Sequence, residues 1–268
     1  MATETVAIIE AGGYRSPGGR DVRIASSVAA AAAGTRLHLP EEKVPAPQPA
    51  GVGDLVTEVT NETSLSAARR LGADAACLVF ASAKNPGGGF LTGAQAQEES
   101  IARASALYPC LRTAREFYDF HRQQRDLRYS DRIIYSPGVP VFRADDGALL
   151  DEPYAVSFLT AAAPNLAAIA TNQPNAAPSV PGLLAARAER VLAVAAAHGH
   201  RKLVLGAWGC GVFRNDPGVV AAAFAAGLAQ TRGRFDHVAF AVLDRQHGAP
   251  THAAFARAFG RTGLLEAR

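Results

Sequence analysis

The chain has 268 residues, with 27 Lys and Arg residues against 24 Asp and Glu residues, and therefore a formal net charge of +3. Apolar residues make up 49% of the chain and charged residues 19%, which excludes a disordered chain and is typical of a globular one. The length fits one large α/β domain or two small domains. The small positive excess is spread over the whole chain, so no dedicated nucleic-acid surface is expected.

Short runs rich in Val, Ile, Leu and Phe alternate with longer helical patterns along the chain. This alternation predicts an α/β fold with three layers, in which helices cover both faces of a mixed central sheet. The predicted elements, in chain order, are a helix at 21–33, a strand at 54–60, a helix at 64–71, a strand at 77–82, helices at 97–107 and 111–128, strands at 132–136 and 155–161, a helix at 181–198, a strand at 202–207, a helix at 217–230, a strand at 237–244 and a helix at 251–259.

The first 53 residues differ in pattern from the rest of the chain. Residues 40–53 read as a loop that contains several prolines, and a second proline-rich loop is predicted at 171–181. We therefore expect residues 1–53 to form a helical N-terminal extension packed on a main domain of residues 54–268.

Three cysteines, Cys77, Cys110 and Cys210, are far apart and show no spacing typical of a zinc site or a dithiol motif. The N-terminus lacks the basic start and long apolar run of a secretory signal, and no stretch approaches the ~20 apolar residues of a spanning helix. We therefore expect reduced thiols in a cytoplasmic monomer without membrane contact and without a bound metal.

The most informative segment is SAKNPGGGFLTGAQAQEESIARAS, residues 82–105, which follows a predicted strand and leads into a helix. The three consecutive glycines, Gly87, Gly88 and Gly89, leave the backbone bare, so a ligand can approach its N–H groups closely. Asn85 and Pro86 fix the entry to the loop. The alternative is a mobile surface turn, since glycine runs are common in turns.

Gln97, Glu98 and Glu99 then open a helix, where the helix dipole stabilises carboxylates. Adjacent helical residues point about 100° apart, so one glutamate can enter a cleft while its neighbour braces the loop. A carboxyl group beside a glycine-lined cleft suits general acid/base chemistry on a glycosidic bond. The simpler interpretation is that the glutamates only favour the start of the helix.

A second glycine loop follows another buried strand, in the sequence KLVLGAWGCGVFRNDP of residues 202–217. The glycines, Gly206, Gly209 and Gly211, precede a helix for which Asp216 is the predicted cap. Successive backbone N–H groups in such a loop form an anion-binding concavity. The spacing is neither that of a phosphate-binding Walker loop nor that of a dinucleotide fingerprint.

Two side chains of this loop invite a functional interpretation. Phe213 can pack on a sugar or a base, or it can anchor the loop in the core. Cys210 lacks a histidine at a recognisable companion position, which argues against a nucleophile. Trp208, the only tryptophan, is predicted to be structural.

Taken together, the motifs NPGGG, AQAQEES and GAWGCGVFRNDP resemble those of the microbial-type poly(ADP-ribose) glycohydrolases, whose fold is a macrodomain with an N-terminal extension. The segments AIIEAGGYRSPGGRDV and TEVTNETSLSAARRL also look like that family, so the similarity covers nearly the whole chain. The resemblance implies a macrodomain-like catalytic domain.

By the same resemblance, Glu99 matches the catalytic residue and Glu98 matches the neighbour that orients the terminal ribose. The positions that match the ribose-binding residues are Asn85, Gly87, Gly88, Gly89 and Gln97, together with Phe213, which positions the ribose against the catalytic glutamate. The positions that match the diphosphate-binding loop are Gly209, Cys210, Gly211 and Val212. Asp244 and Arg245, after the last strand, are assigned to the adenine side by analogy with other macrodomains.

The resemblance implies hydrolysis of the ribose–ribose bond of poly(ADP-ribose), with Glu99 as general acid/base, release of ADP-ribose and no cofactor or metal. Substrates would be poly(ADP-ribose) or ADP-ribosylated proteins. Two alternatives stay open: a module that only binds ADP-ribose, and a hydrolase of another ADP-ribosyl linkage, on protein or nucleic acid. A general nucleotide-phosphate enzyme would need an acidic metal-binding cluster near the second glycine loop, where only Asp216 lies.

Overall fold

The structure, a computed structural model, describes residues 1–45 and 54–260. Its contacts divide the chain into two units, each built from several segments. Unit 1 comprises Met1–Glu41, Val79–Arg125 and Ser130–Ala162, and unit 2 comprises Glu42–Leu78, Asp126–Tyr129 and Ala163–Arg268.

Among the described residues, the main sheet has seven strands in the order β3-β6-β7-β5-β8-β9-β4. Strands β3, β6 and β7 pair antiparallel, whereas β5, β8, β9 and β4 pair parallel. Strand β5 (Ala75–Phe80) has residues in both units. The mixed sheet with flanking helices confirms the predicted α/β class.

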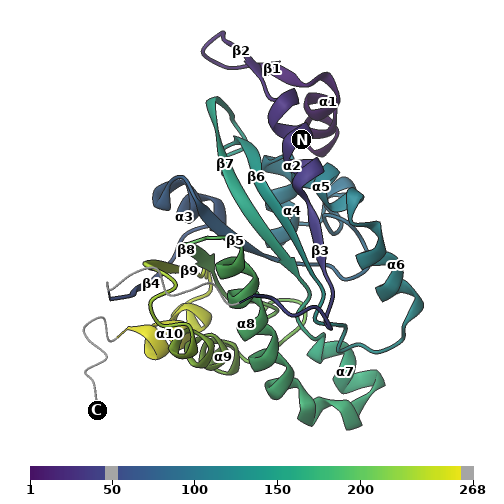
Figure 1. Ribbon diagram of the computed structural model, residues 1–268, viewed down its shortest axis with the longest axis vertical. Helices are drawn as coiled ribbons and strands as arrows, with labels where there is room; N and C mark the ends of the chain where they lie inside the picture. Colours follow the sequence, from purple (N-terminus) through teal and green to yellow (C-terminus); the bar gives the residue numbers. More distant parts are fainter. Residues whose placement is uncertain (46–53, 261–268) are drawn as a thin grey trace. The chain divides into compact units, whose positions relative to one another are not determined.

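Unit 1 is built on a long antiparallel hairpin of β6 and β7, drawn in teal in Figure 1. Helices α2 and α5 contact β6 in this unit. The elements of unit 1 are α1 (Ala2–Ala11), β1 (Gly13–Arg15), β2 (Asp21–Arg23), α2 (Ala25–Gly34), β3 (Arg36–His38), the short 3₁₀ helix η1 (Phe90–Thr92), α4 (Gln97–Ala104), α5 (Leu107–Thr113), α6 (Arg115–Gln123), β6 (Ile133–Arg143) and β7 (Leu149–Ala161).

Unit 2 contains the parallel strands, and its helices α8, α9 and α10 pack side by side (Figure 1). Its core is closed by stacked and edge-to-face rings, in which Phe240 contacts Phe224, Phe255 and Phe259. The elements of unit 2 are β4 (Val56–Thr60), α3 (Ser64–Leu71), α7 (Leu166–Asn172), the 3₁₀ helix η2 (Pro174–Ser179), α8 (Val180–Ala197), β8 (Lys202–Leu205), α9 (Pro217–Gln230), β9 (His237–Ala241) and α10 (Pro250–Phe259).

Two helices of unit 2 begin where their sequence signals place them. The side chain of Thr63 accepts a hydrogen bond from the Ser66 N–H at 3.0 Å and caps α3. The Asp216 carboxylate accepts the Val219 N–H at 3.0 Å and caps α9, whose first residue is Pro217. The predicted boundaries of both helices are confirmed.

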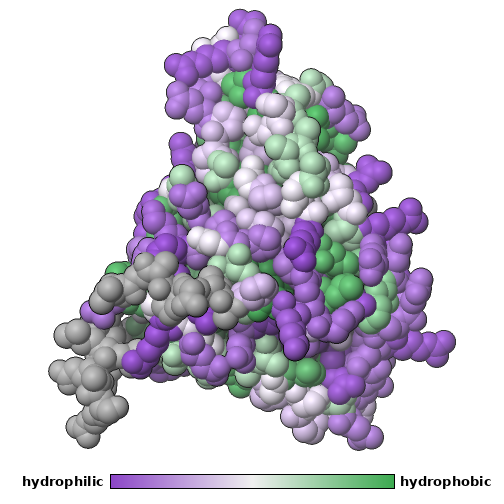
Figure 2. Space-filling model, in the orientation of Figure 1, coloured by the Kyte–Doolittle hydropathy of each residue, from purple (hydrophilic) through white to green (hydrophobic). Residues whose placement is uncertain are grey.

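The predicted helix at 21–33 is wrong in its first turn. Residues Asp21–Arg23 form β2, which pairs with β1 in a two-stranded hairpin, and α2 begins only at Ala25. On the face drawn in Figure 2, hydrophilic side chains cover this hairpin. The turn between its strands contains Pro17, Gly18 and Gly19, which is a hairpin signal that competes with the helical pattern.

The predicted helices at 97–107 and 111–128 are replaced by three shorter helices, α4, α5 and α6, and residues 124–128 are not helical. Pro109 stands in the first turn of α5, where a missing N–H costs nothing, so a new helix starts there. The predicted loop at 171–181 is also wrong, because its residues complete α7, form η2 and begin α8.

The predicted boundary at residue 53, between an N-terminal extension and the main domain, stays a prediction. Part of the predicted extension joins the main sheet, since β3 pairs antiparallel with β6. Of the predicted loop at 40–53, residues 46–53 lie outside the described residues. None of the helices in the described ranges has the length and apolar character needed to cross a bilayer.

Candidate active site

The first glycine loop lies in unit 1 between β5 and α4, and two of its glycines have backbone angles that favour glycine. Gly87 has φ +71° and Gly88 has φ +60°, both in the left-handed region. A Cβ atom on Gly88 would overlap the Glu99 Oε1 atom, and one on Gly87 would lie 3.0 Å from the Phe90 ring. The bare backbone of Gly88 therefore makes room for the Glu99 carboxyl group.

The Glu99 carboxyl group is fixed by backbone donors at both oxygens. Oε1 accepts the Gly89 N–H at 3.0 Å, and Oε2 accepts the Ala96 N–H at 3.1 Å. The second contact is the reciprocal half of a capping box, in which Ala96 has no side-chain oxygen to complete the pair. The residue is 9% exposed, so it is largely buried and keeps a small accessible surface beside the loop that orients its carboxyl group.

The Glu98 side chain is more deeply buried, at 2% exposure, and one of its oxygens lacks a partner. Oε2 accepts the Ser82 N–H at 2.6 Å, whereas Oε1 has no hydrogen-bond partner among the described residues. Burial raises the pKa of Glu98 well above its ordinary value, and the neighbouring Glu99 charge raises it further. Hydrogen bonds from the backbone of Ser82 and Gly87 oppose the shift without cancelling it.

A buried tyrosine lies close enough to this carboxyl group to be affected by its charge. Burial raises the pKa of Tyr118 well above its ordinary value, and the charge of Glu98 adds to the shift. The Tyr118 hydroxyl, like Glu98 Oε1, has no hydrogen-bond partner among the described residues.

Gln97 and Asn85, the other two predicted ribose-binding side chains of this segment, have different surroundings. The Gln97 Oε1 atom accepts the Phe80 N–H at 2.9 Å and ties the end of β5 to the start of α4. Asn85 is exposed, and its backbone N–H donates to Ser82 Oγ at 3.2 Å. No described residue bonds the Asn85 side-chain amide, which therefore remains available to a ligand.

The second glycine loop lies in unit 2 and is fixed by the buried side chain of Asn215, which is 2% exposed. Its Nδ2 atom donates to the Pro164 carbonyl at 2.9 Å and to the Gly209 carbonyl at 3.2 Å. Gly209 has φ +72°, and a Cβ atom there would overlap Asn215 Nδ2 and lie 2.6 Å from the Cβ of Ala163. The sequence did not single out Asn215, although it holds this loop in shape.

The middle of this loop presents backbone donors to its surroundings. In the ranges that the structure describes, the N–H groups of Gly211, Val212 and Phe213 have no hydrogen-bond acceptor. Val212 is 82% exposed, and a Cβ atom on Gly211 would meet open space. Unpartnered N–H groups on a fixed loop suit an anion. The Cys210 N–H is not among them, because it donates to the Ala207 carbonyl at 3.1 Å. The diphosphate role of residues 209–212 stays a prediction.

Phe213 is half-buried, and its backbone is bound to the start of α7. Its carbonyl accepts the Ala167 N–H at 2.9 Å, and its ring lies 6.0 Å from the Tyr129 ring at an interplanar angle of 44°. Burial raises the pKa of the Cys210 thiol to about 12, so the thiol stays protonated near neutral pH. A protonated thiol is a poor nucleophile, which agrees with the expectation that Cys210 is not a nucleophile.

Asp244, assigned by the sequence to the adenine side, uses its carboxylate to start α10. Oδ2 accepts the Thr251 N–H at 2.7 Å, and Oδ1 accepts the Gln246 N–H at 3.0 Å. The hydrogen bond from the Gln246 backbone holds the pKa of Asp244 below its ordinary value, with those from Thr251 and His252 adding to it. Arg245 is exposed. The adenine role of both residues stays a prediction.

The sequence did not single out four residues that lie in or interact with these two loops and the carboxyl pair. Asn215 precedes the Asp-Pro cap of α9, and a polar residue in a glycine loop was the one available signal for it. The others act through long-range packing or through backbone atoms, which no local pattern reveals. They are Ser82, Tyr118 and Tyr129. No group of three or more His, Cys, Asp or Glu side chains suited to a metal ion occurs within residues 1–45 and 54–260.

A mixed α/β sheet, a carboxyl pair on a glycine loop in unit 1 and a loop with free backbone donors in unit 2 fit the class of macrodomain-like glycosyl hydrolases. A family model described as the microbial-type PARG catalytic domain matches residues 2–144, more than half of the chain. The chain belongs to this family of poly(ADP-ribose) glycohydrolases, which confirms the resemblance and the enzyme class inferred from the motifs.

Solved structures agree with the family over nearly the whole chain. The chain is 54% identical to the poly(ADP-ribose) glycohydrolase of Thermomonospora curvata, covering 96% of this chain and 97% of that chain with a TM-score of 0.88. The same enzyme bound to the inhibitor ADP-HPD matches with a TM-score of 0.87, the same identity and the same coverage.

The enzyme of Deinococcus radiodurans in complex with ADP-ribose is 47% identical, with 88% of this chain and 98% of that chain covered and a TM-score of 0.81. The predicted macrodomain-like fold is therefore confirmed. None of the curated protein sequences matches the chain.

Proposed function

We propose that this chain hydrolyses the ribose–ribose O-glycosidic bonds of poly(ADP-ribose) and releases ADP-ribose, with Glu99 as the general acid/base. The observation that carries the proposal is the Glu99 carboxyl group, which the backbone N–H groups of Gly89 and Ala96 fix at both oxygens while the residue stays 9% exposed. Such a group is held in one orientation, as general acid/base chemistry needs. The family of the chain supports this reaction.

In the proposed reaction, the protonated Glu99 carboxyl group gives its proton to the oxygen of the leaving ribose as the glycosidic C–O bond breaks. The electrons of that bond leave with the oxygen, and the anomeric carbon becomes oxocarbenium-like. A water molecule then bonds to this carbon, and the Glu99 carboxylate takes the proton that the water loses. One water molecule is consumed for each ADP-ribose released.

Glu98 orients the ribose in this scheme. Its partnerless Oε1 atom can exchange a hydrogen bond with a ribose hydroxyl, and its raised pKa favours the protonated carboxyl group. The available side-chain amide of Asn85 supports its assignment to the same ribose, along with the backbone of residues 87–89. Gln97 contributes by holding β5 to α4, since its oxygen accepts the Phe80 N–H.

The loop of residues 209–212 binds the diphosphate in this proposal. The free N–H groups of Gly211 and Val212 supply donors without side-chain charge, and the Asn215 amide keeps the loop in one shape. Phe213 positions the ribose. A Deinococcus radiodurans member of the family has been solved in complex with ADP-ribose, which supports ADP-ribose as the ligand here.

We also propose that the enzyme works as a cytoplasmic monomer on poly(ADP-ribose) or on ADP-ribosylated proteins. The free thiols of Cys77, Cys110 and Cys210 support a reducing compartment.

The test is the release of free ADP-ribose from purified poly(ADP-ribose) in the presence of a chelator. The unaltered chain should release ADP-ribose, and Glu99→Gln should lose about 10²–10⁴-fold in rate, the usual contribution of a general acid/base. Glu116→Gln, an exposed acid at the start of α6, is the matched control and should keep the rate.

Absence of release by the unaltered chain would overturn the proposal in favour of a module that only binds ADP-ribose or of another linkage. Full activity of Glu99→Gln would overturn the assignment of the acid/base.

A further inference from the structure

We propose that Tyr129 is a positioning residue for the reaction. It sets the orientation of the Phe213 ring and thereby the rate at which the bound substrate is hydrolysed. The inference rests on the proposed role of Phe213 and extends it to a residue on a different segment of unit 2. Three observations carry it: a rigid turn that presents Tyr129, a shared anchor for Tyr129 and Phe213, and the contact between their rings.

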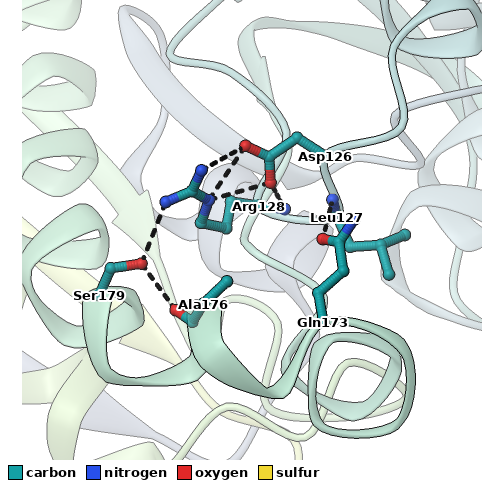
Figure 3. A network of polar contacts seen from close by, with 6 residues as sticks. All are labelled: Asp126, Leu127, Arg128, Gln173, Ala176 and Ser179. Atoms are coloured by element: carbon teal, nitrogen blue, oxygen red, sulfur yellow. Dashed lines mark hydrogen bonds and ion pairs between the residues drawn. The ribbon is translucent and has the colours of Figure 1, made fainter.

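The turn that presents Tyr129 is closed by an ion pair within four residues (Figure 3). The Arg128 guanidinium group bonds both carboxylate oxygens of Asp126, at 2.9 Å from Nε to Oδ1 and 2.7 Å from Nη2 to Oδ2. The Arg128 backbone N–H also donates to Asp126 Oδ1 at 2.9 Å, and the Tyr129 N–H donates to the Asp126 carbonyl at 3.1 Å. A bidentate arginine fork fixes direction as well as distance, so the turn has one geometry.

Further hydrogen bonds tie the turn to residues 173–179, which follow α7 and include η2 (Figure 3). The Leu127 N–H donates to Gln173 Oε1 at 3.0 Å. Arg128 Nη1 donates to Ser179 Oγ at 3.4 Å, and that hydroxyl donates to the Ala176 carbonyl at 2.7 Å. The turn is therefore held at both its backbone and its arginine.

The start of α7 anchors the turn and the Phe213 backbone at the same place. The Asn165 N–H donates to the Leu127 carbonyl at 3.0 Å, and two residues later the Ala167 N–H donates to the Phe213 carbonyl at 2.9 Å. The first N–H groups of a helix have no partner within the helix, so these two carbonyls satisfy them. The backbone near Tyr129 and the backbone of Phe213 are consequently both held by the first residues of α7.

The backbone of Tyr129 shows that its placement is imposed. Its φ of +61° lies in the left-handed region, which an aromatic residue rarely adopts. Asn and Gly adopt this region at lower cost, yet the position carries a large ring. Strained residues persist where the surrounding structure determines them, and they cluster at functional sites.

The contact between the two rings is the product of this arrangement. Their centroids lie 6.0 Å apart at an angle of 44°, within the range of favourable aromatic pairs. Phe213 is half-buried, between Val212 and Arg214, which are both exposed. Tyr129 therefore limits the directions that the Phe213 ring can take.

The decisive experiment compares kcat and KM of Tyr129→Asn, Tyr129→Phe and Phe213→Ala in the release of ADP-ribose. Asn suits the left-handed backbone and removes the ring, so the turn should keep its fold while kcat falls about tenfold and KM stays within about twofold. Phe keeps the ring and should restore kcat to within about twofold of the unaltered chain.

A double variant separates positioning from a general loss of structure. Tyr129→Asn should lower kcat no further when Phe213 is already Ala, because the ring that Tyr129 orients is absent. Arg128→Lys, which loses the fork onto Asp126, should lower kcat in the same direction, whereas Arg115→Lys, in the exposed pair with Asp119 on α6, should not.

The outcomes are distinguishable from those of the proposed function. If the unaltered chain is active and Phe213→Ala lowers kcat, but Tyr129→Asn leaves kcat unchanged, the inference alone is overturned. The inference is also overturned if the fold-loss in kcat of the double variant equals the product of the fold-losses of the two single variants. An inactive unaltered chain overturns the proposed function itself.

Discussion

The two glycine loops of this enzyme use glycine for opposite purposes. In the loop of residues 85–89, Gly89 donates its backbone N–H to the Glu99 carboxyl group and Gly88 leaves side-chain space for it, so that the loop presents the Glu99 side chain. In the loop of residues 206–216, the Asn215 side chain bonds backbone carbonyls and fixes the loop. This loop therefore presents the free N–H groups of residues 211–213. The first arrangement suits proton transfer, and the second suits holding an anion.

This difference explains why the same residue type is needed in both loops. Gly88 cannot take a side chain because Glu99 occupies the space, and Gly209 cannot take one because Asn215 and Ala163 occupy it. Each glycine therefore protects the group that its loop presents. Substitutions at the two positions should harm different steps of the reaction.

The largest effect is expected for Gly88→Ala. The new Cβ atom would overlap Glu99 Oε1 at a backbone angle that already costs an L residue ~1–3 kcal/mol, so the carboxyl group must move. We expect the rate of ADP-ribose release to fall about 10²-fold or more, as measured by steady-state kinetics.

The matched control is Gly93→Ala in the same segment. Gly93 also has a left-handed backbone, with φ +94°, but a Cβ atom there meets open space. This variant should lose stability and keep most of its rate. Equal losses of rate in the two variants would show that backbone strain, and not the displaced carboxyl group, is responsible.

A smaller effect is expected for stability at Glu98. Because its pKa is raised in the folded state, the folded chain binds more protons than the unfolded chain above the ordinary value of 4.5, and stability falls as pH rises through this range. The amide of Glu98→Gln would not ionise, so the free energy of unfolding of this variant should gain on that of the unaltered chain as the pH rises above about 4.5. Urea unfolding across that range measures the difference.

The corresponding control is Glu116→Gln, whose side chain is exposed on α6. A trend with pH that both variants share would not come from Glu98. If Glu98→Gln shows no trend with pH, the carboxyl group of Glu98 is ionised in the folded state, contrary to the role proposed for it.

The smallest effect is expected from alkylation of the second loop. With its pKa raised to about 12, the Cys210 thiol is protonated near neutral pH and should react slowly with iodoacetamide. We expect mass spectrometry to find Cys210 unmodified after brief treatment at neutral pH and activity to be retained. Rapid labelling with loss of activity would instead indicate a reactive thiolate in this loop.

The sequence predicted the α/β class and both glycine loops because these depend on local patterns. Helices α3 and α9 were predicted to the residue, since Thr63 and Asp216 cap them and Pro217 opens the second one. Helix α2 was predicted too early because the apolar residues near residues 22–24 fit a helix as well as a strand. Pairing with β1 decided for the strand, and such pairing is not visible locally.

The site could be predicted only where the residue type itself indicates a role, as for a carboxyl group or a run of glycines. Glu99 and the glycines are recognisable from the sequence, but the orientation of Glu99 depends on N–H groups of residues 89 and 96, which any residue type could supply. Tyr129 was missed because the role proposed for it depends on a left-handed turn fixed by Arg128 and by the start of α7. The deep burial that raises the pKa of Glu98 was likewise a property of the fold.

The most direct test of the division between the two loops is the affinity for ADP-ribose of Glu99→Gln and Gly209→Ala, measured side by side by titration calorimetry. We expect Glu99→Gln to keep the Kd of the unaltered chain within about threefold, because it disturbs proton transfer and not the anion-binding donors. We expect Gly209→Ala to weaken binding about tenfold or more, because its Cβ atom displaces Asn215 and with it the loop. An unchanged Kd for Gly209→Ala, together with a large loss of affinity for Glu99→Gln, would contradict this division.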